Sequence, residues 1–319
     1  MLTYFCIFLI NKYIFWIILN KKLRFYFIPY LYFKEKFYWL KANKGNLIGK
    51  DFYHFGKKIA RKLLTRRIIS PKLLLNPVSI VRYFEYDFAI KSIINYSLSN
   101  KKVLDISSPY LFGFYCNFNL NIDYTYLNPD TNDLNLVKKY SKKLLNKHNF
   151  KTETGDATRL NYLNESFDVV ISISVIEHID NNGDITAIKE MMRVLKKDGI
   201  LILTFPVSKS FEIEYADNDT YGLNASKTGN KFFFQRLYDE SSIKERLLKN
   251  ISDFTILEQQ IFGENEFGFY DKYSERWKKY GLFETVKDPF YISKYFDILN
   301  SFNEIKKSAV IGITLRKNK

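Results

Sequence analysis

The sequence contains almost no cysteine. Cys6 and Cys116 are the only two among 319 residues, too few and too unlike a ligand pair for a disulfide framework or a zinc site. A small disulfide-stapled secreted domain is therefore excluded, and a reducing compartment is expected. The hydrophobic share of 46% and the aromatic share of 18% also exclude a disordered chain. The length suffices for one large domain and an additional element.

Acidic residues are scarce at the N-terminus. Residues 1–80 contain 16 Lys and Arg but only Glu35 and Asp51 as acidic residues, so +14 of the formal net charge of +15 lies there. The remainder of the chain is nearly neutral, with 33 basic and 32 acidic residues. The basic charge therefore acts through an N-terminal extension, and nucleic acid is not expected as a partner of the domain that follows.

The extension begins with an apolar segment. A removable signal peptide would have a basic start and a cleavage site of small residues, and the segment has neither. Met1–Leu19 is almost wholly apolar and aromatic, but Lys12 interrupts it. One central Lys costs about 3 kcal/mol and each Leu, Ile or Phe returns about 0.5 kcal/mol, so a spanning helix is near break-even. The segment either spans a bilayer or lies on it. Lys21, Lys22 and Arg24 would keep the following chain in the cytoplasm.

A second stretch of the extension predicts contact with an anionic surface. In Lys57–Ile69, basic pairs alternate with Ile, Ala and Leu, which is typical of a basic amphipathic helix on a membrane. A solvated charged helix is the alternative. We expect residues 1–70 to associate with an anionic membrane surface, at the cytoplasmic, inner face of the membrane.

Prolines mark the end of the extension. Residues before Pro71 and Pro77 are steered away from helix, so the chain divides into an extension, 1–77, and a domain, 78–319. The domain opens with apolar residues at helical spacing over Val78–Leu98, which predict a helix packed on the core.

Three apolar runs predict parallel strands: Lys102–Ile106, Phe167–Ser172 and Ile200–Phe205. Between the last two, Asp184–Leu195 repeats apolar residues at helical spacing, and Gly199 is the expected helix cap. A right-handed crossover of this kind places both strands in one sheet, with their carboxyl ends on the same edge.

Four motifs in a fixed order carry a resemblance to a known family. They are V-L-D-I from Val103, G-D-A-T-x-L from Gly155, S-F-D-V-V-I-S-I-S-V-I-E-H-I from Ser166 and R-V-L-K-x-D-G-x-L-I-L-T-F-P from Arg193. The ordered set is similar to class I S-adenosylmethionine-dependent methyltransferases of type 11, over roughly Leu98–Lys317, whereas any one motif would be weak.

The resemblance implies an α/β fold with a doubly wound, Rossmann-like sheet of seven strands and helices on both faces. S-adenosylmethionine, the cofactor, would lie over the carboxyl ends of the first strands. Two insertions, at about 207–240 and 263–307, would shape the acceptor pocket, although a small secondary core is the commoner explanation for their aromatic residues. The missing strands would come from Tyr124–Leu127, Lys151–Thr154, Thr255–Phe262 and Ala309–Arg316.

The first loop departs from the family pattern. The family has acidic-x-Gly-x-Gly-x-Gly there, and this chain has Ser107, Pro109 and Leu111 at the glycine positions. Glycine permits positive φ and close approach of the backbone to a ligand, so a differently shaped loop is expected, with Gly113 supplying flexibility slightly later. Asp105 would still face the cofactor's ammonium group, with the small Ser107 tolerated beside it. A strand-end turn residue is the alternative for Asp105.

Three further residues would hold the nucleoside of the cofactor. Asn128 stands where the family places a ribose-binding carboxylate, and an ordinary Asn-Pro turn that also includes Asp130 is an equal alternative. Asp156 is the strongest site residue, because the family's acidic residue in G-D-A accepts a hydrogen bond from the adenine amino group. The amide of Ala157 would donate to the ring. An aspartate that only caps the next turn is the alternative. No metal site is expected.

A Glu-His pair follows the fourth strand, where this architecture usually places chemistry. Methyl transfer from a sulfonium to a hydroxyl needs in-line approach and removal of the acceptor's proton, and His178 would be that base. The pair Glu177-His178 is also a common feature of the family, so a structural or cofactor-side role for His178 is an alternative. No Asn/Asp-Pro-Pro-aromatic run follows, which argues against an amino-methylating nucleic-acid enzyme.

The resulting hypothesis is a S-adenosylmethionine-dependent methyltransferase that acts on a small-molecule or glycan-like acceptor, most plausibly on oxygen. Two alternatives stay open. One is a methyltransferase fold that has lost the cofactor and serves as an interaction module at a membrane. The other is nucleic-acid methylation with the basic extension as a clamp on the phosphate backbone.

Overall fold

The computed structural model describes residues 26–42, 47–96, 101–120, 122–145 and 149–318. The apolar segment Met1–Leu19 lies outside the described residues, so its expected relation to a bilayer stays a prediction. Within the described ranges, no helix combines the length and the apolar character that crossing a membrane requires.

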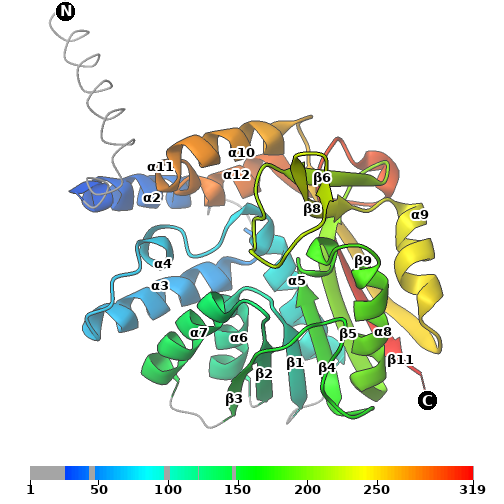
Figure 1. Cartoon of the computed structure of the whole chain (residues 1–319). Coiled ribbons are helices and arrows are strands. Elements are labelled where there is room, and N and C mark those ends of the chain that lie inside the picture. Colours follow the sequence, from blue (N-terminus) through cyan, green and yellow to red (C-terminus); the bar gives the residue numbers. More distant parts are fainter. Residues whose placement is uncertain (1–25, 43–46, 97–100, 121, 146–148, 319) are drawn as a thin grey trace, which may run out of the picture.

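One central sheet organises the chain (Figure 1). Its strands run in the order β10-β9-β11-β5-β4-β1-β2-β3, and five neighbours, from β5 to β3, are parallel. β11 is antiparallel to both β5 and β9, and β10 is antiparallel to β9. The strands are β1 Lys102–Ile106, β2 Asp123–Leu127, β3 Phe150–Glu153, β4 Phe167–Ile173, β5 Leu195–Val207, β9 Phe254–Glu264, β10 Phe296–Leu299 and β11 Ala309–Lys317.

The predicted α/β fold with a doubly wound sheet is confirmed. Each of the seven strands expected from the sequence is present within a few residues of its expected bounds. β1 lies between β2 and β4, so the order of the strands reverses there and their carboxyl ends lie on the same edge of the sheet. The eighth strand, β10, adds an edge and comes from the second insertion, which therefore extends the sheet as well as flanking it.

Alternate side chains of the parallel strands enter two separate cores. Val103 and Val169 face one core, which contains residues of helices α5 (Ile80–Tyr96), α6 (Tyr110–Asn119) and α7 (Thr131–Leu144). Leu104 and Val170 face the other, which contains residues of α8 (Gly183–Val194). A strand buried on both faces needs apolar residues at every position, which explains the uninterrupted apolar runs in the sequence. Each fully buried Val or Leu contributes about 1.5–3 kcal/mol.

The described part of the N-terminal extension shares the first of these cores. Its helices are α2 (Ile28–Ala42), α3 (Lys50–Thr65) and α4 (Pro71–Leu75). Phe52 of α3 lies 4.9 Å from the ring of Tyr86 on α5 and 4.1 Å from that of Tyr115 on α6. Of the apolar residues that the sequence suggested for a membrane surface, Ile59, Ala60 and Leu63 are packed in this core, whereas Leu64 and Ile69 are exposed. The basic helix also begins at Lys50, earlier than expected.

Gly199 does not cap a helix. α8 ends at Val194 and β5 begins at Leu195, so Gly199 lies within the strand. A side chain there would place Cβ 2.9 Å from the carbonyl oxygen of Asp168, the neighbouring strand's second residue. The glycine is therefore required for close packing of two backbones, and the residue before it, Asp198, adopts the positive φ of 60°.

The two insertions form small units of their own. The first contains a three-stranded sheet of β6 (Glu212–Ala216), β8 (Lys231–Leu237) and β7 (Lys227–Thr228), and it is followed by the short helix α9 (Glu240–Ser242). The second contains α10 (Phe269–Tyr280), α11 (Leu282–Thr285) and α12 (Asp288–Tyr295). Phe269 stacks on Tyr295 at 4.1 Å, as a secondary core under long loops would require.

Candidate active site

The loop after β1 keeps one feature of a glycine loop without its glycines. Only Ser107, Ser108 and Pro109 separate β1 from α6. Ser107 has a φ of 54°, the left-handed region that favours glycine, at a cost of roughly 1–2 kcal/mol. Its backbone nitrogen and its hydroxyl both donate to the carbonyl of Leu127, at 2.8 and 3.0 Å, and thereby hold this conformation. The turn after β1 is therefore stabilised from β2.

Asp105 at the end of β1 is fully buried, and both carboxylate oxygens have partners inside the protein. The amide of Ser108 donates to Oδ1 at 3.0 Å, and the hydroxyl of Tyr124 donates to Oδ2 at 2.5 Å. Burial raises the pKa of Asp105 to about 6, against the lowering effect of these hydrogen bonds. The contacts agree with a strand-end turn residue, and contact with a cofactor ammonium group stays a prediction.

Gly113 does not supply loop flexibility. It lies within α6, where a Cβ would come 2.8 Å from the ring of Tyr124. The missing side chain leaves room for that ring, whose hydroxyl reaches Asp105. Gly113 therefore serves the packing of β2 against α6, and the expectation of a flexible loop at this position was wrong.

Asn128, at the end of β2, is engaged on both sides of its amide. Nδ2 donates to Asp133 at 2.8 Å, and Oδ1 accepts from the amide of Asp130 at 2.8 Å. Asp130 is the N-cap of α7 and accepts from the amide of Asn132. This arrangement is the ordinary turn that the sequence left open, and a ribose contact of Asn128 stays a prediction.

Asp156 lies exposed after β3, beside the buried Ala157. Its Oδ1 accepts from both the amide and the hydroxyl of Thr158, each at 2.8 Å, so the residue does cap the next turn. Its exposure leaves the carboxylate accessible to a ligand as well. The structure brings Asp156 to the same edge of the sheet as Asp105 and Asn128, because all three follow parallel strands.

His178 lies on a 3-10 turn, Ile176–His178, directly after β4 and is mostly buried. Its Nδ1 is 2.8 Å from the carbonyl oxygen of Phe234, which can only accept, so Nδ1 carries the proton. The unprotonated Nε2 lies 3.1 Å from the hydroxyl of Tyr221, which donates to it. Burial lowers the pKa of His178 to about 4, so the ring is neutral at pH 7.

A buried charged pair on α5 contacts the carboxyl edge of the sheet. This pair was not identified from the sequence as part of the site. Glu85 is completely buried and forms an ion pair with Arg82. Its other oxygen accepts from Thr204 of β5 at 2.9 Å and from Ser174 after β4. The signal in the sequence was its position, four residues after Val81 and thus on the apolar face of the predicted helix.

Glu177, next to His178, is a buried carboxyl with one oxygen unpaired within the described ranges. It is 1% exposed, and its Oε2 has no hydrogen-bond partner among the described residues. Its Oε1 lies 3.7 Å from Nε2 of His178. Burial, with the charge of Glu85 as a smaller contribution, raises the pKa of Glu177 to about 8. The carboxyl is therefore mainly protonated at neutral pH.

The first insertion covers this end of the sheet. In Figure 1, β6 and β8 lie above the carboxyl ends of β4 and β5. The amide of Ser226 donates to Asp180, Arg236 donates to the carbonyl of Ile179 at 2.6 Å, and Tyr238 donates to Asp184 at 3.0 Å. These bonds join the insertion to the segment after β4, so the groups around His178 are held in fixed positions.

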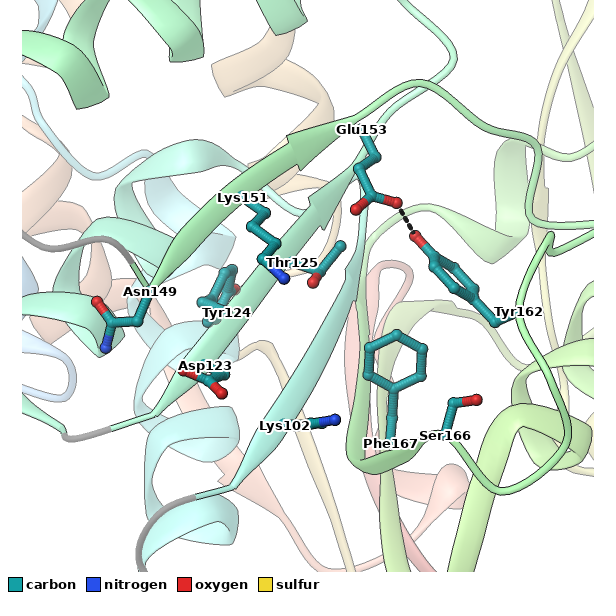
Figure 2. A pocket seen from close by; sticks show the side chains of 10 residues that line it. All are labelled: Lys102, Asp123, Tyr124, Thr125, Asn149, Lys151, Glu153, Tyr162, Ser166 and Phe167. Atoms are coloured by element: carbon teal, nitrogen blue, oxygen red, sulfur yellow. Dashed lines mark hydrogen bonds between the residues drawn. The ribbon is translucent and has the colours of Figure 1, made fainter.

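A cavity lies elsewhere, on one face of β1, β2 and β3 (Figure 2). It has a volume of about 750 Å³ and begins near Lys102 and Asp123, at the amino ends of β1 and β2. Among the strand residues that line the cavity, Glu153 lies at the carboxyl end of its strand, β3. Its carboxylate accepts a hydrogen bond from the hydroxyl of Tyr162 at 2.7 Å. The described residues contain no group of three or more His, Cys, Asp or Glu that could hold a metal ion.

One comparison with known proteins gives a family match over part of the chain. Residues 112–203, from α6 to β5, match the family described as methyltransferase domain. This stretch of the chain is therefore similar to a methyltransferase domain. The match includes Asn128, Asp156 and His178, and S-adenosylmethionine is the cofactor that this family uses. No curated protein sequence matches the chain significantly.

Solved structures similar to the chain include other methyltransferases. A S-adenosylmethionine-dependent methyltransferase from Methanosarcina mazei has 14% identity and a TM-score of 0.46, covering 71% of this chain and 97% of its own. Coclaurine N-methyltransferase, bound to N-methylheliamine and SAH, has 11% identity and a TM-score of 0.48, covering 72% and 69%. The YcgJ protein from Bacillus subtilis has 15% identity and a TM-score of 0.46, covering 73% and 98%.

The residues at the carboxyl edge fit S-adenosylmethionine unequally. Ser107 keeps the left-handed turn of the family's loop, and the exposed Asp156, beside Ala157, is accessible to an adenine ring. The polar atoms of Asp105 and Asn128 are already hydrogen-bonded within the protein. The methyltransferase domain would therefore hold the adenosine end mainly through Asp156 and the loop at Ser107.

Proposed function

We propose that the methyltransferase domain methylates a hydroxyl oxygen of a small-molecule or glycan-like acceptor, with His178 as the base. S-adenosylmethionine, when bound, supplies the electrophilic methyl group. A hydroxyl that receives the methyl group must lose its proton as the new bond forms. A group that can take up this proton therefore has to lie beside the hydroxyl. The observation that carries the proposal is Nε2 of His178, unprotonated and directed at a hydroxyl, that of Tyr221.

The contact with Tyr221 indicates where an acceptor would bind. The side chain of Tyr221 is 47% exposed, so its hydroxyl reaches Nε2 from the solvent side. An acceptor hydroxyl would take the place of the phenol, at a similar distance from Nε2. The rings of Tyr221 and Phe234 lie 6.3 Å apart and nearly parallel, at 10°, and offer apolar faces of the kind that pack on a sugar or a planar ring.

The fixed tautomer makes His178 specific for a hydroxyl. Because Nδ1 donates to Phe234, the ring presents a lone pair at Nε2 and has no donor there. With its pKa lowered to about 4, the ring stays neutral through the physiological range. An ammonium acceptor, which arrives charged, would have to be deprotonated before it reached this buried site, whereas a hydroxyl arrives neutral.

The test compares His178→Gln with His54→Gln in the full-length chain. The second variant removes a histidine that is exposed on α3 and serves as the matched control. With methyl-labelled S-adenosylmethionine and a panel of methyl glycosides, phenols and amines, we expect transfer to hydroxyls. The His178 variant should lower kcat by roughly 10²–10⁴-fold while calorimetry gives unchanged cofactor affinity. Unchanged kcat, or transfer to amines alone, would contradict the proposal.

We further propose that the chain acts at the cytoplasmic face of an anionic membrane. Support comes from the charge of residues 1–80 and from the exposed side chains of Lys58, Arg61 and Lys62 on α3. Each basic residue near an anionic surface contributes about 1 kcal/mol. The apolar contact must come from a surface other than the inner face of α3, which the domain already covers.

A further inference from the structure

The solvent face of α2 is apolar along its length. All its exposed residues except Lys41 are apolar or aromatic. Four of them, Tyr30, Phe33, Phe37 and Leu40, are 50%, 73%, 52% and 67% exposed. Their spacing of three and four residues places them on one side of the helix, and we name them the α2 stripe. Exposed hydrophobic residues that occur singly are ordinary, whereas a contiguous row indicates an interaction surface.

The opposite face of α2 packs on the protein and thereby turns the stripe toward the solvent. Leu31 packs in a small core with Leu75 of α4 and Phe283 of α11. Trp39 stacks on Tyr53 of α3, with ring centroids 3.8 Å apart and an angle of 7° between the planes. Figure 1 places α2 at the periphery of the molecule, beside α11 and α12. The helix is therefore anchored by one face while the other meets the solvent.

The charged residues of α2 that lie beside the stripe are all positive. Lys34, Lys36 and Lys41 flank it, and the ammonium group of Lys41 lies 4.5 Å from the ring centroid of Phe37. The single acidic residue of α2, Glu35, is completely buried in an ion pair and presents no charge to the solvent. Lysine stems can lie along apolar surface while their ammonium groups stay in water.

We propose that the α2 stripe inserts into the interfacial layer of an anionic lipid bilayer. Aromatic side chains with flanking lysines suit the level of the headgroups, where apolar rings and positive charges both find partners. The chain that precedes α2 continues the pattern, because the apolar Met1–Leu19 is followed by Lys21, Lys22 and Arg24. A second copy fits less well, since two stripes face to face would bring the same lysines together. The proposal rests on the membrane association and on none of the proposed chemistry.

The test reads the environment of the stripe directly. In a full-length chain with Cys6→Ser and Phe37→Cys, an environment-sensitive fluorophore is attached to the new thiol, since Cys116 is buried. The matched control carries the label at Leu163→Cys, a position that is 84% exposed in the loop before β4. Phosphatidylcholine vesicles with and without phosphatidylglycerol are added. We expect a blue shift at position 37 with anionic vesicles only, and none at position 163.

Each outcome separates the proposal from its alternatives. A chain that floats with anionic vesicles without a shift at position 37 would leave membrane association standing and overturn the role of the stripe. A chain that does not bind vesicles would overturn both. A blue shift before vesicles are added would mean that the stripe is already covered, and light scattering would then tell a second copy from the chain's own N-terminal segment.

A second pair of variants measures the apolar contribution. Phe33→Ser with Phe37→Ser should lower partition into anionic vesicles at least about tenfold, because two aromatic side chains no longer leave water. The control, Leu163→Ser with Phe267→Ser, removes two apolar side chains elsewhere that are 84% and 67% exposed. Both double variants should keep the thermal transition of the parent chain, since the replaced side chains are exposed. Equal partition of the two would contradict the proposal.

Discussion

The two halves of the carboxyl edge use their polar residues in different ways. At the ends of β1 and β2, Asp105 and Asn128 are hydrogen-bonded within the protein and hold turns in place. At the ends of β4 and β5, Glu177 has an oxygen without a partner among the described residues, and His178 presents a lone pair to a half-exposed phenol. A stable fold tends to satisfy its buried polar groups, so the unsatisfied half is the better candidate for chemistry.

The difference follows from the first loop. Where the family has glycines that bring the backbone close to a ligand, this chain has a three-residue turn and then an apolar helix, α6. Tyr124 fills the space above Gly113, and its hydroxyl reaches Asp105, where a cofactor group would otherwise be expected. The first half of the edge has therefore gained internal contacts, and Asp156 is its remaining exposed carboxylate among the expected site residues.

A clear loss of stability is expected when the internal contacts of the first half are removed. Asp105→Ala leaves the buried hydroxyl of Tyr124 without its acceptor, which costs about 2 kcal/mol of the free energy of unfolding. Asp123→Ala, at the exposed start of β2, is the control and should change it by less than about 0.5 kcal/mol. Urea unfolding of the full-length variants measures both. Equal stability of the two would mean that Asp105 is not structural.

The buried groups of the second half, Glu177 and His178, should make the free energy of unfolding depend on pH. Burial raises the pKa of Glu177 from 4.5 to about 8 in the folded state, so the unfolded chain loses this proton first as the pH rises. The free energy of unfolding then falls with pH by up to about 1.4 kcal/mol per unit between these two values. Below pH 6.5, His178 acts in the opposite direction, because its pKa is lowered to about 4 and protonation favours the unfolded chain.

Glu177→Gln isolates this contribution between pH 6.5 and 8, because His178 titrates in both proteins and its effect cancels in the comparison. We expect the parent chain to lose stability with rising pH in this window and the variant to lose much less. Urea unfolding at a series of pH values measures the slopes. Parallel slopes for the two proteins would show that Glu177 is ionised in the folded state, and the contrast between the two halves of the edge would disappear.

Much of this architecture could be predicted from the sequence, because it depends on local patterns. Strands buried on both faces need unbroken apolar runs, so β1, β4 and β5 were found from Lys102–Ile106, Phe167–Ser172 and Ile200–Phe205. The site depends on long-range pairings. Glu85 meets Thr204 across 119 positions, and no periodicity in the sequence reports that contact.

The residues that cover His178 could not be predicted from the sequence either. Its partners Phe234 and Tyr221 come from an insertion in which β6 is largely exposed and β8 buries only Phe233 and Arg236. These strands therefore differ from core strands, which are buried along their length. The aromatic residues there could equally belong to a secondary core. Only their placement over the end of β4 gives two of them a part in the site.

The smallest effect is expected for Asp156, through the affinity for the cofactor. Asp156→Ala removes the exposed carboxylate and both bonds that it accepts in the turn after β3. Thr158→Ala removes only the bond from the hydroxyl and keeps the carboxylate. Calorimetric titration of the full-length proteins with S-adenosylmethionine should give about fivefold weaker binding for Asp156→Ala, about 1 kcal/mol, and no change for Thr158→Ala. Equal affinities would reduce Asp156 to a turn cap. A folded parent chain without measurable affinity would favour the interaction module, because the internal bonds of Asp105 and Asn128 would then have replaced the cofactor's contacts.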